Sequence, residues 1–148
     1  MTLVVRAAGA ADLSALATLF DAYRRFYRQP ADVALARRFM AERLAKSDST
    51  IFVAEDGDAL LGFTQLYPSL CSVEAAPIMV LYDLFVTLEA RGRGIAQALM
   101  QAAEAHARAA GCARLDLSTA NDNCAAQALY EARGWVRDEV FRVYSLTL

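Results

Sequence analysis

The 148-residue chain is predicted to form a single α/β domain spanning residues 1–148. Three observations lead to this fold class. The length suits one domain with a sizeable core. Strand-like and amphipathic helical stretches follow one another in the order β, α, α, three β, α, β, α, two β. In mid-chain, an apolar strand-like stretch runs into a glycine-containing turn and then an alanine-rich helix.

The first half of the chain is expected to contain one strand, two helices and a β-hairpin. Residues 3–6 are short and β-branched, as strands are. Asp12 is expected to cap a helix whose apolar face ends at Tyr27, and Pro30 to end that helix and open the second. The hairpin strands are expected at residues 51–54 and 59–67.

In the second half, residues 68–77 are expected to form a loop before the central strand at residues 81–86. A helix should follow from Gly94 to about Ala110, ended by Gly111. The remaining predicted elements are a strand at 114–118, a helix at 123–133 and a closing pair of strands within 135–148.

The turn between the central strand and the third helix is predicted to bind phosphate. The first N–H groups of a helix lack internal partners, and the helix dipole adds positive charge there. Gly92 and Gly94 have no Cβ, so a ligand can approach their backbone closely. Arg91 and Arg93 add positive charge. The alternative interpretation is a surface turn that happens to contain these residue types.

The turn does not match a Walker loop, because it lacks the required lysine. A dinucleotide-binding domain stays open, since Asp116 lies at a suitable distance downstream to contact a ribose. Against that alternative, Gln97 occupies a position where the dinucleotide fingerprint has glycine or alanine.

Two motifs resemble those of the GCN5-related N-acetyltransferase (GNAT) family. The sequence RGRGIA at 91–96 is similar to its [RQ]-x-x-G-x-[GA] signature, and NCAAQALYEARGW at 123–135 is similar to N-x-x-A-x-x-L-Y-x-x-x-G-F. The resemblance implies a mixed, mostly antiparallel sheet, splayed at its central strand, with helices on both faces. It also implies acetyl-CoA as cosubstrate. The implied cofactor-binding residues are Leu84, Phe85, Val86, Arg91, Gly92, Arg93, Gly94, Ile95, Ala96, Asn123 and Ala126.

The resemblance implies that the chain is an enzyme, and two residues are candidates for its catalysis. Acetyl transfer requires a neutral amine and a proton for the departing CoA thiolate. In the family, the tyrosine of the second motif lies near the thioester sulfur, which makes Tyr130 the candidate acid. Asp83 is the candidate base, acting directly or through water, because a carboxylate is unexpected in an apolar strand unless it faces a cleft. The alternative is an aspartate that only accepts backbone hydrogen bonds.

The acceptor is expected to be a small primary amine such as an amino acid. Diamine acetyltransferases carry a Glu-Asp pair in the central strand, whereas this chain has Tyr82 and Asp83. The expected substrate-binding residues are Tyr23, Tyr27, Arg28, Tyr67 and Ser72. The alternatives are a histone or other protein lysine acetyltransferase, a polyamine acetyltransferase, and a non-catalytic acyl-CoA-binding module.

Composition restricts the partners and the compartment. The net charge of −2 argues against nucleic acid, and no apolar run approaches the roughly twenty residues of a membrane helix. The N-terminus lacks the pattern of a signal peptide, and three cysteines without metal-type spacing suit a reducing cytoplasm with no metal. The nonpolar stretch at 141–148 favours a homodimer.

Overall fold

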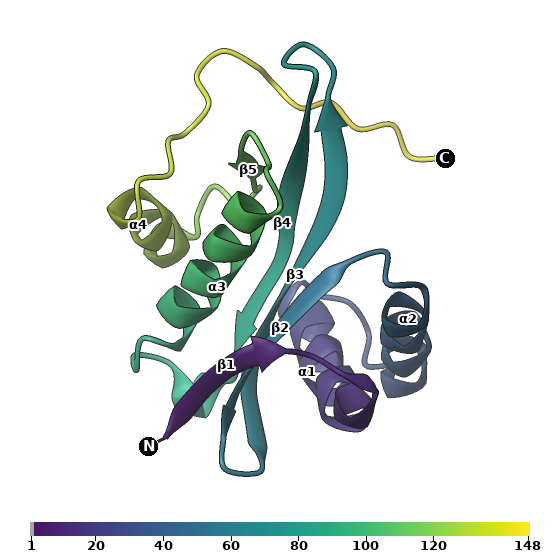
Figure 1. Ribbon diagram of the computed structural model, residues 1–148. Helices are drawn as coiled ribbons and strands as arrows, with labels where there is room; N and C mark the ends of the chain where they lie inside the picture. Colours follow the sequence, from purple (N-terminus) through teal and green to yellow (C-terminus); the bar gives the residue numbers. More distant parts are fainter. Residues whose placement is uncertain (1) are drawn as a thin grey trace. The chain divides into compact units, whose positions relative to one another are not determined.

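The computed structural model describes residues 2–148, which separate into two units with the boundary between Leu117 and Ser118. The strands of the first unit are β1 (Leu3–Ala7), β2 (Thr50–Asp56), β3 (Ala59–Cys71), β4 (Ala76–Val86) and β5 (Leu115–Asp116) (Figure 1). Its helices are α1 (Leu13–Phe26), α2 (Val33–Lys46) and α3 (Ile95–Ala109), with short 3-10 turns η1 (Ala10–Asp12) and η2 (Leu88–Ala90). The second unit contains α4 (Cys124–Ala132).

The five strands form one mixed sheet in the order β1-β2-β3-β4-β5. The first three pairings are antiparallel, and β4 pairs with β5 in parallel. The parallel ladder pairs Met79 with Leu115 and Val80 with Asp116, and β5 pairs with no later residue of β4. On its other edge, β4 stays paired with β3 as far as Val86. The sheet is therefore mostly antiparallel and open beside β4, which confirms the predicted fold class.

Helices cover both faces of this sheet (Figure 1). On one face, α1 and α2 pack on β2, β3 and β4 around a core that includes Phe20, Met40 and Phe63. On the opposite face, α3 packs through Ile95 and Leu99 on residues of the same strands. Because strand side chains alternate between faces, each buried strand residue belongs to one of these two cores.

One irregularity shapes the centre of the sheet. Gln65 of β3 pairs with Asp83, while the next residue, Leu66, pairs with Leu81. Tyr82 is therefore an extra residue in β4, a β-bulge. A bulge brings two successive side chains to the same side of a strand, so Tyr82 and Asp83 both project toward the face that α1 covers. A regular strand would place them on opposite faces.

Several predicted boundaries were wrong. Residues 68–77 are largely strand, because β3 continues to Cys71 and β4 begins at Ala76, leaving a turn of four residues. The first helix ends at Phe26, four residues before Pro30. The backbone of Arg28 takes a left-handed conformation, with φ of 64°, which turns the chain away from the helix. The second helix is opened by Asp32, whose side chain accepts a hydrogen bond from the Leu35 N–H, and not by Pro30. In each case local hydrogen bonds, which composition does not show, fix the boundary.

The predicted closing strands within 135–148 were also wrong. Between Ser118 and Leu148, all described, α4 is the one helix or strand. A strand needs a partner for its backbone groups, and the second unit contains no other strand to supply one. The segment is extended and leaves apolar side chains exposed, namely Val136, Val140, Phe141, Val143, Tyr144, Leu146 and Leu148.

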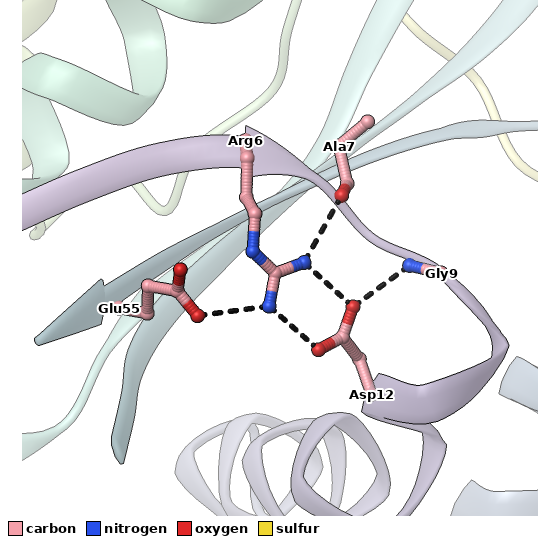
Figure 2. Close-up of polar contacts among 5 residues, drawn as sticks. All are labelled: Arg6, Ala7, Gly9, Asp12 and Glu55. Atoms are coloured by element: carbon pink, nitrogen blue, oxygen red, sulfur yellow. Dashed lines mark hydrogen bonds and ion pairs between the residues drawn. The ribbon is translucent and has the colours of Figure 1, made fainter. Parts of the chain in front are cut away.

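Asp12 stands at the N-cap position of α1, as predicted, but its side chain makes no capping hydrogen bond to that helix. Its carboxylate accepts two hydrogen bonds from the Arg6 guanidinium, both 2.8 Å, and one from the Gly9 N–H at 2.7 Å (Figure 2). Arg6 also contacts Glu55 at 2.8 Å, which joins β1, β2 and η1. The Arg6 hydrogen bonds are the main reason that the pKa of Asp12 falls to about 2. The cluster fixes the start of α1 on one face of the sheet, and Asp83 projects toward the same face.

Candidate functional site

The turn before α3 has the geometry of an anion site. Gly92 and Gly94 both have φ of 77°. Residues that carry a Cβ rarely adopt this backbone conformation. A Cβ built on either glycine would meet nothing within 4 Å among the described atoms, so the backbone faces open space. Gly94 is the N-cap of α3, and no described side chain caps the helix there. The N–H groups of the first turn of α3 are thus available to bind a phosphate. The two glycines leave room for such a group beside the backbone.

The two arginines of the turn make specific contacts. The Nε of Arg91 donates to the Val86 carbonyl at 3.0 Å, and its guanidinium lies over the rings of Phe26 and Phe85, 5.5 and 5.6 Å from their centroids. Arg93 donates from Nη2 to the Glu89 carbonyl at 3.1 Å. Arg91 therefore links the end of β4 to the turn, and both guanidinium groups add positive charge near the N-terminus of α3.

The strand segment that leads into the turn contains the other three cofactor candidates of this unit. Leu84 and Val86 pack on the α3 face, and Phe85 packs on the α1 face. The ladder to β5 has ended by this point, and no strand among the described residues continues it. The backbone at 84–86 can therefore offer hydrogen bonds to an extended ligand on that side.

Asp83 is the one charged residue on the buried α1 face of β4. Its side chain is 6% exposed, and Oδ2 accepts a hydrogen bond from Gln65 Nε2 at 2.8 Å. Burial raises the pKa of the carboxyl above its ordinary range, while the hydrogen bonds from Gln65 and Tyr23 act in the opposite direction. A carboxylate with a raised pKa is a stronger base than an exposed one, which is the property that the predicted role of Asp83 requires.

Gln65 and Ser49, which were not predicted from the sequence, complete this polar cluster. Gln65 is fully buried, and its Oε1 accepts a hydrogen bond from Ser49 Oγ at 2.8 Å. The neighbouring Thr64, also fully buried, donates from Oγ1 to the Asp83 carbonyl at 2.8 Å. The signal was present in the sequence, because Thr64 and Gln65 are polar residues within an otherwise apolar strand.

Aromatic side chains surround Asp83. Tyr23 of α1 donates from its hydroxyl to the Tyr82 carbonyl at 3.3 Å, and its ring packs on Phe63, Phe85 and Tyr27. Tyr67 of β3 meets Tyr82 edge to face at 5.5 Å. Burial, helped by the charge of Asp83, raises the pKa of Tyr67 to about 12. Tyr67 therefore stays protonated at neutral pH.

The other predicted substrate residues lie farther out. Tyr27 is exposed and contacts Tyr23, and Arg28 is exposed just beyond the end of α1. Ser72 lies in the turn between β3 and β4, about 23 Å along the hairpin from Gln65 at about 3.3 Å per residue. The structure thus brings Tyr23 and Tyr67 to Asp83, but not Ser72.

The arginines near Arg28 differ in their contacts. Arg25 pairs with Asp21 at 3.3 Å, and Arg37 donates to Ser14 Oγ at 2.7 Å. Arg24, one helical turn before Arg28, has a buried Nη1 that has no hydrogen-bond partner among the described residues. Arg24, Arg28 and Arg38 are the arginines of this group for which the described residues supply no side-chain hydrogen bond or ion pair.

The second unit holds the remaining candidates. Asn123 is the N-cap of α4, and its Oδ1 accepts a hydrogen bond from the Ala126 N–H at 3.3 Å. Tyr130 is half-buried on the same helix, with its ring 6.3 Å from that of Trp135. After α4, Gly134 takes a positive φ of 90°. These local contacts explain why the motif keeps an asparagine at the start of the helix and a glycine after its end.

Other features of the described residues are structural. The Nε2 of His106 lies 3.2 Å from Thr50 Oγ1, and its ring packs edge to face on Phe52, so its contacts join α3 to β2. Within residues 2–148, no cluster of three or more His, Cys, Asp or Glu residues has the arrangement of a metal site. None of the described helices is both long and apolar enough to cross a bilayer.

A mixed sheet splayed at β4, leading into a glycine turn at a helix start, defines the class of acyl-CoA-dependent N-acyltransferases. The model of the acetyltransferase (GNAT) family matches residues 16–135. The chain belongs to this family, and it is an acetyl-CoA-dependent N-acetyltransferase.

Individual relatives agree with the family assignment. The chain is 40% identical to the uncharacterized N-acetyltransferase YhfO of Bacillus subtilis over 144 residues, 97% of each protein. It superposes with a TM-score of 0.90 on the crystal structure of a probable acetyltransferase, at 37% identity, covering 100% of this chain and 98% of the other. An aminoglycoside N-acetyltransferase in complex with CoA shares the fold, with a TM-score of 0.84 at 19% identity over 99% and 96% of the two chains.

Proposed function

We propose that the protein transfers the acetyl group of acetyl-CoA directly to the primary amine of a small molecule, of which an amino acid is the best candidate. The observation that carries this proposal is the buried carboxylate of Asp83, held among tyrosines on the strand that leads into the anion-binding turn. A carboxylate in such a place can attract an ammonium group and remove its proton.

Asp83 would act as the base. An alkylamine with a pKa near 10.4 is only about 0.1% neutral at pH 7, so proton removal is a real requirement. Burial raises the pKa of Asp83 and brings its basicity closer to that of the amine. The rings of Tyr67 and Tyr82 add an aromatic surface that favours a cation beside the carboxylate.

Tyr130 would supply the proton, or a hydrogen bond, to the departing CoA thiolate. A phenol with a pKa near 10 is a suitable donor to a thiolate of pKa near 8.5. Support comes from the match of residues 123–135 to the motif in which this tyrosine lies near the thioester sulfur. Asn123 and Ala126, on the same turn of α4, would contact the pantetheine arm.

The backbone from Gly92 to Ala96 would hold the CoA pyrophosphate. We predict that Gly94→Asp weakens CoA binding at least tenfold, or about 1.4 kcal/mol, because it puts a negative side chain where the phosphate should lie. Calorimetric titration with CoA measures this change.

The matched control is Gly111→Asp, at the other end of α3. Gly111 has φ of 75° and equally open surroundings, so this variant carries the same backbone strain without the charge at the N-terminus. Equal CoA affinities in the two folded variants would contradict the phosphate site.

Charge favours a small acceptor with its own carboxylate over a polycation. Polyamines and basic peptide tails are best held by several carboxylates, and Asp83 is the one charged residue in its cluster, where Tyr82 takes the place of an acid. Arg24 and Arg28 offer donors that repel a polycation but can bind a carboxylate.

An amine panel, assayed for CoA thiol release, tests the acceptor. We expect at least one amino acid to exceed both spermidine and a histone H3 tail peptide in kcat/KM. The variant Arg28→Ala should weaken carboxylate-bearing acceptors more than simple alkylamines. The proposal is wrong if spermidine or the peptide is far better than every amino acid tested. Turnover of no amine at all would favour an acyl-CoA-binding module.

We also propose that the protein is a cytoplasmic homodimer. The exposed apolar side chains of residues 136–148 would be covered by a second copy, because an extended segment with this composition is rarely left in water. Light scattering should give twice the 16.1 kDa chain mass at micromolar concentration. A monomer mass would contradict this assembly.

A further inference from the structure

The side chain of Gln65 is a fully buried amide with both ends engaged. Its Nε2 donates to Asp83 Oδ2 at 2.8 Å, and its Oε1 accepts from Ser49 Oγ at 2.8 Å. Gln65 and Asp83 are also register partners across β3 and β4, next to the bulge at Tyr82. A buried amide without partners is costly, so a glutamine at this position needs both contacts.

We infer that Gln65, oriented by Ser49, is a positioning residue that holds the carboxylate of Asp83 in place and stabilises its ionised form. This inference rests on the proposed function, in which the ionised carboxylate accepts the proton of the amine. An ionised carboxylate can only accept hydrogen bonds, so it matches the Nε2 donor. Ser49 fixes the other end of the amide, because its hydroxyl donates to Oε1 and so turns Nε2 toward Asp83.

The hydrogen bond from Gln65 matters because most groups around Asp83 carry no positive charge. Tyr23 faces it from α1, Tyr67 from β3, and Tyr82 adjoins it in β4. Arg43, near the end of α2, and Asp48, just beyond it, act through their charges on Tyr67. The groups that favour ionised Asp83 are thus the neutral donors of Gln65 and Tyr23, which work against the effect of burial.

Gln65 does not transfer the proton itself. An amide nitrogen keeps both hydrogens at neutral pH, so the proton taken up by Asp83 must leave by another route. The expected effect of Gln65 is therefore on the equilibrium between ionised and protonated Asp83 and on the orientation of the carboxylate.

The test is a direct titration of Asp83 by carbon-13 NMR on protein with labelled aspartate, using Asp83→Asn to assign its signal. Gln65→Met keeps the size and burial of the side chain but removes its donor, and should raise the pKa of Asp83 by at least about one pH unit. The matched control is Thr64→Val, which is equally buried and loses a hydrogen bond to the Asp83 carbonyl, not to its carboxylate. It should leave that pKa unchanged.

Ser49→Ala provides a second, milder variant at a half-buried position. It frees the amide to rotate and should raise the same pKa by a smaller amount. An unchanged pKa of Asp83 in Gln65→Met would overturn the inference. If that variant does not fold, an unchanged pKa in Ser49→Ala would overturn it.

The same variants separate this inference from the proposed function. If Asp83 is the base, the acid limb of the pH profile of kcat/KM moves upward with the titrated pKa in Gln65→Met. If the NMR pKa moves while the acid limb does not, the positioning of Asp83 by Gln65 stands and the assignment of Asp83 as the base is wrong.

Discussion

Replacing Asp83 by asparagine is expected to lower kcat/KM by about 10³-fold, within the range that general base catalysis contributes. The amide has nearly the same shape, and its carbonyl can accept the hydrogen bond from Gln65 Nε2, but it cannot take a proton. The acid limb of the pH profile of kcat/KM should disappear with the carboxylate. Thiol release with the best acceptor, measured from pH 5 to 9, checks both effects.

The same substitution should leave the fold as stable at neutral pH, or more stable. Burial raises the pKa of Asp83 in the folded protein above the value of about 3.9 in the unfolded chain. Between these two values the folded protein binds more protons than the unfolded one, so the free energy of unfolding decreases as pH rises. That decrease persists at neutral pH, and Asp83→Asn removes it. Urea denaturation at pH 5 and 8 measures the difference.

Asp21→Asn is the matched control for this experiment. Asp21 is also buried, but it accepts the Asp32 N–H at 2.9 Å and pairs with Arg25, away from the proposed chemistry. Its replacement should reduce stability and preserve kcat/KM, the opposite pattern. Retention of kcat/KM within about threefold in Asp83→Asn would show that Asp83 is not the base.

Tyr130→Phe is expected to lower kcat by about 10²-fold with little change in KM for either substrate. The ring contact with Trp135 remains, and only the hydroxyl is lost. Loss of the acid should also remove the basic limb of the pH profile of kcat. Steady-state kinetics with acetyl-CoA and the best amine provide the measurement.

Trp135→Phe tests whether packing alone explains the effect of changing Tyr130. This variant keeps an aromatic neighbour for Tyr130 and retains the hydroxyl, so kcat should change by less than about threefold. A rise in KM with unchanged kcat in Tyr130→Phe would make Tyr130 a binding residue and exclude the acid role.

The sequence was sufficient to predict the elements that have strong periodicity or clear end signals. The helix ended by Gly111 and the helix followed by Gly134 were predicted to within one or two residues, and both glycines take positive φ. The turn at Gly92 and Gly94 was predicted because both glycines lie between an apolar strand and an alanine-rich helix, and both take positive φ. Phosphate binding at this turn stays a prediction.

Contacts between residues far apart in the chain could not be predicted from the sequence. The contact of Gln65 with Asp83 joins residues 18 apart, and that of Ser49 with Gln65 joins residues 16 apart. Residues 135–148 alternate like a strand, but alternation does not show whether a partner strand is available. The interpretation of Asp83 as an unusual residue in its strand could be made locally, whereas its partners required the register of the sheet.

The bulge at Tyr82 separates two kinds of tolerance to mutation. Because one additional residue in β4 directs Tyr82 and Asp83 to the same face, this arrangement depends on the number of residues in the strand as well as on their identity. Position 82 should therefore accept other side chains, since its own is 66% exposed. Deletion of Tyr82 would leave Leu81 and Asp83 adjacent, opposite Leu66 and Gln65, so the ladder would become regular and every other residue would keep its face. Such a deletion would remove the second side chain from the Asp83 face, together with the local bend and twist that a bulge gives to a strand.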